Sequence, residues 1–163
     1  MGGGEGRPKT RIVEVTLDEH SVVRWSPEVE HERNVAIYDL LEENVFAPIG
    51  DERGPYAVRL SIEENRLVFD IRSSEDGAEV RRIALPLTGF RSIIKDYFTV
   101  CGSYYDAIKH ASPRQIEALD MGRRGLHNEG STLLRDRLAD KVELDLNTAR
   151  RLFTLICVLH IRG

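Results

Sequence analysis

The chain has few cysteines and no long hydrophobic run. Its two cysteines, Cys101 and Cys157, stand in apolar helical patterns, and neither has a second ligand at a spacing such as Cys-x-x-Cys. We therefore interpret both as reduced thiols packed as small hydrophobes, and no metal site is expected. The longest apolar stretch, residues 152–159, is far shorter than the roughly 20 residues of a membrane-spanning helix. The sequence thus predicts no membrane span.

The motifs of several common chemistries are also missing. There is no His-x-x-x-His pair, no Gly-x-Gly-x-x-Gly, no P-loop lysine motif and no Gly-x-Ser-x-Gly elbow. No cofactor is predicted. The sequence shows no basic start followed by an apolar run, so no secretory signal is expected. Together with unpaired thiols, this pattern predicts a soluble protein of the cytoplasm.

Charge is distributed unevenly along the 163 residues. The net charge is −4, but residues 1–86 carry 11 basic and 18 acidic side chains, whereas residues 87–163 carry 12 basic and 9 acidic ones. One explanation is complementarity between two halves of one fold. The other is a surface on the C-terminal half that attracts anions. A hydrophobic fraction of 41% is ordinary for a globular protein and excludes wholesale disorder.

The periodicity of apolar residues predicts an α+β fold in the order β-α-β-β-β-α-α-α. Residues 1–10, rich in Gly and Pro, are expected to be a disordered tail, and residues 11–163 a single α+β domain. An antiparallel meander should pack against a helical C-terminal half. Strands are expected at 11–17, 56–62, 67–71 and 80–85, and helices at 27–44, from 87 to about 110, at 113–138 and after residue 145.

Three helices have recognisable start signals. Ser26-Pro27 and Ser112-Pro113 each combine a serine cap with proline at the first helical position. Asp145 can cap the last helix, whose second half is apolar nearly all round. Such a pattern predicts a central, buried helix.

Residues 121–130, with the sequence MGRRGLHNEG, interrupt the amphipathic pattern of the third helix. Glycine costs a helix interior about 1 kcal/mol relative to alanine, and this segment holds three glycines. At 100° per residue, Gly122 and Gly130 fall within the apolar arc of the helix. We therefore expect these glycines to let a neighbouring helix approach closely.

The polar residues of the same segment point in different directions. Arg123 falls inside the apolar arc and His127 lies at its edge, whereas Arg124 and Asn128 point further outward. Glu129 lies on the opposite flank, about 200° from His127, so these two residues cannot form an acid–base pair on one helix. A guanidinium that faces a core must find a carboxylate, a carbonyl or an anionic ligand.

The first helix offers partners for this segment. Arg33 falls within its apolar arc, and Glu30 lies on the shoulder of that arc. Two interpretations stay open. The arginines belong to a buried network of structural salt bridges, or they line a polar pocket that receives an acidic group.

Four segments carry a resemblance to a known family. They are residues 26–45 (SPEVEHERNVAIYDLLEENV), 56–72 (YAVRLSIEENRLVFDIR), 121–130 (MGRRGLHNEG) and 149–160 (ARRLFTLICVLH). In these segments the chain resembles uncharacterised protein family 0262, small proteins found mainly in alphaproteobacteria. The resemblance implies no activity, substrate or catalytic residue that carries over to this sequence.

A function therefore has to be inferred from the residues themselves, and two hypotheses follow. The first hypothesis is a cytosolic, non-catalytic binding or regulatory module for an anionic small molecule or a protein partner. Its site would be built from Arg123, Arg124, His127, Asn128, Arg33 and Glu30. The alternative is an enzyme acting on a phosphoryl or carboxylate substrate, with His127 as the acid–base group, Arg123 as the charge clamp and Glu30 as a second carboxylate.

Two kinds of macromolecular partner receive less support. A helix followed by three antiparallel strands and a helix is superficially similar to a double-stranded RNA-binding domain. The first helix and the strands are acidic, however, and no lysine cluster opens residues 87–110, so nucleic-acid binding is not favoured. Homo-oligomerisation is open, through an edge of the meander or through the tyrosine-rich second helix.

Overall fold

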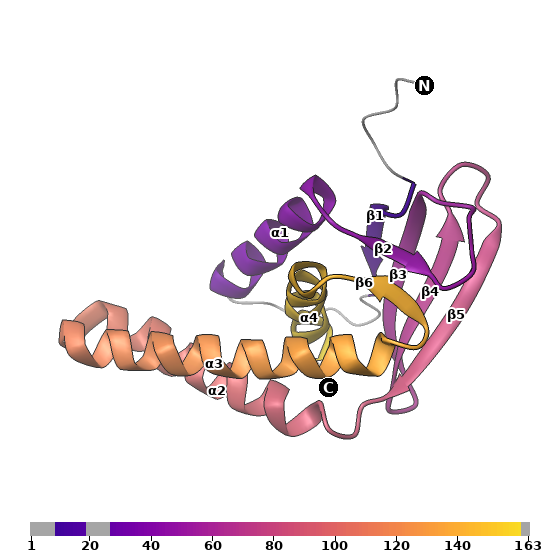
Figure 1. Cartoon of the computed structure of the whole chain (residues 1–163). Helices are drawn as coiled ribbons and strands as arrows, with labels where there is room; N and C mark the ends of the chain where they lie inside the picture. The colour runs from indigo at the N-terminus through magenta and orange to yellow at the C-terminus, as the bar shows by residue number, and fades with distance from the viewer. Residues whose placement is uncertain (1–8, 19–26, 161–163) are drawn as a thin grey trace.

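The fold was examined in a computed structural model, which describes residues 9–18 and 27–160 (Figure 1). The predicted α+β class is confirmed. The elements follow one another as β1 (Ile12–Leu17), α1 (Pro27–Glu42), β2 (Phe46–Pro48), β3 (Tyr56–Glu63), β4 (Arg66–Ser73), β5 (Glu79–Pro86), α2 (Arg91–His110), α3 (Pro113–Leu138), β6 (Val142–Leu144) and α4 (Leu146–His160). Most of the tail expected at 1–10 lies outside the described residues.

The main sheet has the strand order β1-β3-β4-β5. Strands β3, β4 and β5 form the predicted antiparallel meander, with Val58 opposite Ile71 and Phe69 opposite Ile83. Strand β1 adds to its edge in parallel with β3, and its Val15 pairs with Val58. The segment between β1 and β3 therefore returns the chain to the same end of the sheet, and α1 lies within it.

The predicted order lacks two short strands. Strands β2 and β6, of three residues each, pair antiparallel, with Phe46 opposite Leu144 and Pro48 opposite Val142. The strands expected from periodicity include neither of these segments. Three residues are too few to show an alternating pattern, and the partner strand lies far away in the sequence, so no local signal marks this pair.

Helix α4 lies between α1, α3 and the main sheet (Figure 1). Its side chains Leu152, Phe153, Leu155 and Ile156 are fully buried, which confirms the predicted central helix. They belong to one hydrophobic cluster that also takes in the inner face of the sheet and the apolar sides of the other helices. Burial of such side chains contributes about 1.5–3 kcal/mol each, so α4 is a main source of stability.

The helix starts that the structure describes agree with the start signals in the sequence. The Ser112 hydroxyl accepts a hydrogen bond from the Gln115 N–H, and the Gln115 side chain reaches back to the Ser112 backbone, which completes a capping box. Asp145 accepts a hydrogen bond of 2.8 Å from the Thr148 N–H at the start of α4. Helix α1 begins at Pro27, as predicted, whereas its expected cap Ser26 lies outside the described residues.

The two cysteines are free and buried, as predicted. Burial raises the pKa of the Cys101 thiol to about 11 and also raises that of Cys157 well above its usual value, so both are protonated at neutral pH.

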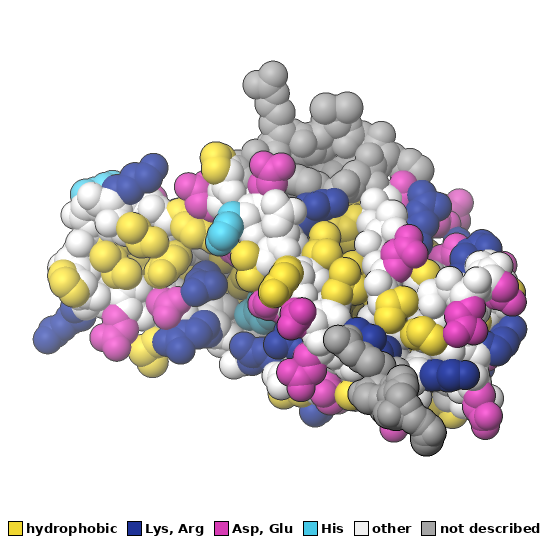
Figure 2. Space-filling model, turned by 90° about the horizontal axis from the view of Figure 1, so that it is seen from above, with side chains coloured by type: hydrophobic (Ala, Val, Ile, Leu, Met, Phe, Trp, Pro, Cys, Tyr) yellow, Lys and Arg dark blue, Asp and Glu magenta, His cyan; other side chains and the backbone are white. Residues whose placement is uncertain are grey.

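Helices α2 and α3 extend together beyond the rest of the molecule, and hydrophobic side chains gather over their far end (Figures 1 and 2). Within the described part of the chain, no helix combines the length and apolarity needed to cross a bilayer.

Gly130 allows α3 to pack closely on α4. A Cβ added at Gly130 would lie 2.1 Å from the Phe153 ring, far inside van der Waals contact. The predicted close approach of a neighbouring helix is therefore correct at Gly130. It is wrong at Gly122, where an added Cβ would make an ordinary contact of 3.8 Å with Val100, and at Gly125 an added Cβ would meet nothing.

The contrast between these glycines predicts opposite effects of one substitution. Gly130→Ala should lower the free energy of unfolding by about 2 kcal/mol, because the phenyl ring must leave its packed position. Gly125→Ala should raise it by about 0.5–1 kcal/mol, because alanine favours the helix and nothing obstructs its methyl group. Urea denaturation of both variants measures this, and equal effects of the two substitutions would contradict the close packing at Gly130.

Candidate functional site

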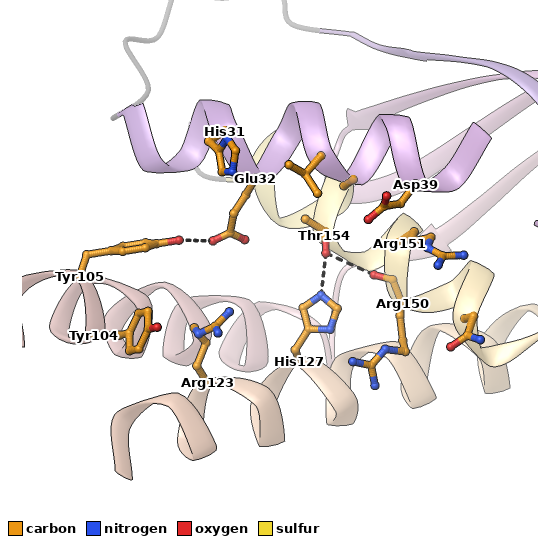
Figure 3. A pocket seen from close by; sticks show the side chains of 13 residues that line it. His31, Glu32, Asp39, Tyr104, Tyr105, Arg123, His127, Arg150, Arg151 and Thr154 are labelled. Carbon is orange, nitrogen blue, oxygen red and sulfur yellow. Dashed lines mark hydrogen bonds between the residues drawn. The ribbon is translucent and has the colours of Figure 1, made fainter. Parts of the chain in front are cut away.

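A cleft of about 330 Å³ opens between α1 on one side and α2, α3 and α4 on the other (Figure 3). Its walls are predominantly charged and aromatic. Helix α1 contributes His31, Glu32, Val35, Ala36 and Asp39; α2 contributes Tyr104 and Tyr105; α3 contributes Arg123 and His127; and α4 contributes Asn147, Arg150, Arg151 and Thr154. Figure 2 shows a face on which basic, acidic and hydrophobic side chains are mixed.

His127 is a partly buried polar residue of this cleft. Its Nε2 lies 2.6 Å from Thr154 Oγ1, and its ring packs at centroid distances of 5.4 Å from Tyr97 and 5.3 Å from Phe153. When Nε2 carries the proton it donates to Thr154, whose hydroxyl donates in turn to the Arg150 carbonyl. Burial, together with the nearby positive charges of Arg150 and Arg123, lowers the pKa of His127 to about 4. The ring is therefore neutral at physiological pH.

Glu32 links α1 to α2 across the inner end of the cleft. Its carboxylate accepts a hydrogen bond of 2.5 Å from the hydroxyl of Tyr105 (Figure 3) and one of 3.2 Å from the hydroxyl of Tyr97. Burial and the adjacent carboxylate raise the pKa of both tyrosines, which therefore stay protonated and act as donors. Hydrogen bonds to a charged acceptor contribute about 1.5–3 kcal/mol each, so this contact fixes α1 above α2.

Arg123 has both ionic and aromatic partners. It lies 2.5 Å from Asp120 on the same helix, and its guanidinium stands 4.8 Å from the ring centroid of Tyr104. Burial opposes its charge, but the hydrogen bond with Asp120 and the charge interactions with Tyr97, Asp120 and Cys101 together outweigh that effect, so the pKa of Arg123 is raised. Its buried Nε finds no hydrogen-bond acceptor among the described residues.

Among the described residues, the hydrogen-bond partners of the two arginines of α4 are neutral groups. Arg150 donates to the side chain of Asn128, and Arg151 donates to the carbonyl of Glu43 at 3.0 Å. In the described ranges, neither guanidinium has a carboxylate oxygen within the 4.0 Å of an ion pair. Both charges line a cleft that is open to solvent, where each guanidinium keeps donors available for an incoming group.

The structure brings some of the predicted site residues together and separates others. Arg123 and His127 both line the cleft, one turn apart on α3. Asn128 takes part indirectly, through its bond to Arg150, and Arg124 pairs with Asp120 at 3.1 Å outside the cleft. On α1, Glu30 is exposed and Arg33 donates to Asn34 at 3.3 Å, and neither of the two lines the cleft.

The carboxylates of α1 and the arginines of α4 that complete the cleft are absent from the predicted site. Glu32 and Asp39 lie four residues before and three residues after the buried Ala36, a spacing that places all three on one helical face. Arg150 and Thr154 are likewise four residues apart on α4. This spacing is the available signal in the sequence, but the apolar second half of α4 is the stronger pattern and indicates the core.

The fold and the cleft define an α+β protein with a charged cleft between its helices. The model of the uncharacterised protein family UPF0262 matches residues 9–162, and this chain belongs to that family. A UPF0262 protein of Paramagnetospirillum magneticum is 59% identical over 155 residues, which cover 95% of this chain and 98% of the relative. One of Azorhizobium caulinodans is 58% identical over 157 residues, 96% of this chain and 97% of the relative. No solved structure matches the chain.

The low pKa of His127 predicts a pH-dependent stability. An unfolded histidine binds a proton as the pH falls through about 6.5, whereas folded His127 does so only near pH 4. The stabilising effect of the neutral ring is therefore complete above pH 6.5 and is lost as the pH falls to 4, by on the order of 3 kcal/mol.

The stability difference between wild type and His127→Gln should therefore shrink by that order between pH 7 and pH 4 in urea denaturation. The matched control is His110→Gln, because His110 is exposed at the end of α2 and should show no such change. An NMR titration in which the His127 ring protonates near pH 6.5 would contradict the assignment.

Proposed function

We propose that this protein is a cytoplasmic, non-catalytic binding module whose ligand is a small molecule with an anionic group. The observation that carries the proposal is the convergence of Arg123, Arg150 and Arg151 on one cleft. Only Arg123 of these three has a carboxylate partner among the described residues. Guanidinium groups bind carboxylate and phosphate through paired hydrogen bonds, and they do so most strongly where water is partly excluded.

The size and lining of the cleft support a small ligand. A volume of about 330 Å³ lies at the lower end of the range of small-molecule sites, roughly 300–1,000 Å³. The positive groups come from α3 and α4, which are packed rigidly through Gly130 and Phe153. Charges on rigid elements need little rearrangement before they meet a ligand, which favours binding.

The chemistry of His127 favours binding over proton transfer. A general acid or base is most effective when its pKa lies near the working pH. His127 has a pKa of about 4, its Nε2 is engaged by Thr154, and its ring is packed between Tyr97 and Phe153. These features suit a neutral, fixed hydrogen-bonding group, and they give no specific support to the enzymatic alternative.

Thermal unfolding with a panel of anions tests the proposal. Phosphate, pyrophosphate, acetate, succinate and citrate are the probes, and a ligand at 100 times its dissociation constant should stabilise by about 2.7 kcal/mol. For a chain of this length the melting temperature should rise by roughly 5–10 °C. Arg150→Gln and Arg151→Gln should each remove most of this shift.

The matched control is Arg114→Gln. Arg114 is exposed in the first turn of α3, far along the chain from the cleft-lining residues of that helix, and its loss should leave the shift intact. A shift that persists in both cleft variants would place the anion elsewhere. No shift with any anion in the wild-type protein would count against the proposed function.

A further inference from the structure

The two walls of the cleft carry opposite charges. Helix α1 presents the carboxylates of Glu32 and Asp39, while α3 and α4 present three arginines (Figure 3). A site for a purely anionic ligand has no use for carboxylates, because each of them repels the ligand. The acidic wall therefore needs an explanation of its own.

The two carboxylates are not equivalent. Glu32 accepts hydrogen bonds from two tyrosine hydroxyls and so has a structural role. The carboxylate of Asp39 points into the cleft (Figure 3), and in the described part of the chain it has neither a hydrogen bond nor an ion pair. Asp39 is half-buried, so this unpaired charge is costly unless a cation reaches it.

Asp39 lies at the same end of the cleft as the arginines of α4. It is two helical turns, roughly 10 Å, from Glu32, which marks the tyrosine end of the cleft. The opposite end is marked by Arg151, whose guanidinium donates to the carbonyl of Glu43, just after the last residue of α1. The Asp39 carboxylate and the two guanidinium groups therefore line the same end of the cleft, and among the described residues they form no ion pair with one another (Figure 3).

We infer that the ligand is a small α-amino carboxylate, whose carboxylate binds Arg150 and Arg151 and whose ammonium group binds Asp39. The inference rests on the proposed function and specifies the substrate class of the same site. An α-amino carboxylate carries both charges within a few ångströms, and a ligand with this pair of charges neutralises both walls at once.

The remaining part of the cleft suits the side chain of such a ligand. Val35, Ala36 and Tyr104 line it beyond the charged end, and Val35 is 42% exposed although it is apolar. Tyr104 and Tyr105 pack edge to face at 5.6 Å and form the far wall, where the Arg123 guanidinium stands over one side of the Tyr104 ring. An apolar side chain placed there covers surface that is otherwise in contact with water.

Binding measurements with matched analogues test this inference. The twenty standard amino acids are first screened by thermal unfolding of the full chain. Isothermal titration then compares L-phenylalanine and L-leucine with their deaminated acids, 3-phenylpropanoate and 4-methylpentanoate, and with the decarboxylated amine 2-phenylethylamine. The best amino acid should bind at least about tenfold tighter than its deaminated acid. The amine should not bind measurably, because it lacks the carboxylate.

The variants separate the roles of the two walls. Asp39→Asn should reduce the affinity for the amino acid by about tenfold or more and raise that for the deaminated acid, because a negative charge leaves the site. Arg150→Gln should weaken both compounds. Glu42→Gln is the matched control, because Glu42 is exposed on the same helix and does not line the cleft. Circular dichroism confirms that each variant is folded.

The results that would contradict the amino-acid ligand are different from those that would contradict the anion site. Deaminated acids or simple anions that bind as tightly as the amino acids would overturn the α-amino carboxylate and leave the anion site standing. The same holds if anions bind and none of the twenty amino acids does. Tight binding of 2-phenylethylamine would overturn both proposals, and so would the absence of binding by every anion, acid and amino acid tested.

Discussion

The packing of α3 on α4 at Gly130 is the contact on which the cleft depends. Only a residue without a side chain lets the Phe153 ring lie against the backbone of α3. This contact fixes the distance between α3 and α4, and it therefore also determines how the residues on either side of it meet. His127, one turn before Gly130, therefore reaches Thr154, the residue after Phe153. A glycine in the middle of a helix lowers the stability of the helix by about 1 kcal/mol relative to alanine. The close contact with Phe153 nevertheless requires glycine at this position.

Helix α4 joins the core to the cleft because its two halves differ. Its second half is buried nearly all round, and its first half exposes Arg150 and Arg151 beside α1. A buried helix moves little, so the guanidinium groups start from a rigid base. The same argument applies to His127, which is enclosed by Tyr97 and Phe153 and is kept neutral by burial. The cleft thus combines fixed positive charges with a fixed neutral hydrogen-bonding group.

Much of the fold follows from periodicity, and less of the site does. The meander was predictable because Tyr56, Val58 and Leu60 alternate with more polar residues, and α3 because of its Ser112 cap. The pairing of β2 with β6 was not, since each strand has only three residues. On α1 the apolar residues are not confined to one face, since Val35 and Tyr38 are exposed whereas Ala36 and Leu40 are buried, so the inward face is poorly defined by the sequence. A rotation of about 100° exchanges Arg33 for Glu32, and this accounts for the different members of the cleft.

The oppositely charged walls of the cleft attract each other, and the anchoring of α1 keeps them apart. Helix α1 is held at both ends. At one end Glu32 is bonded to Tyr105 and Tyr97, and at the other the side chain of Asn44 bonds to β1 and to the last turns of α1. Between these anchors a helix is stiff, so the backbone of α1 at Asp39 cannot approach α4 without breaking one of them. The charges stay separated because their helices are fixed, and a preorganised, unpaired arrangement of this kind is what a ligand with both charges requires.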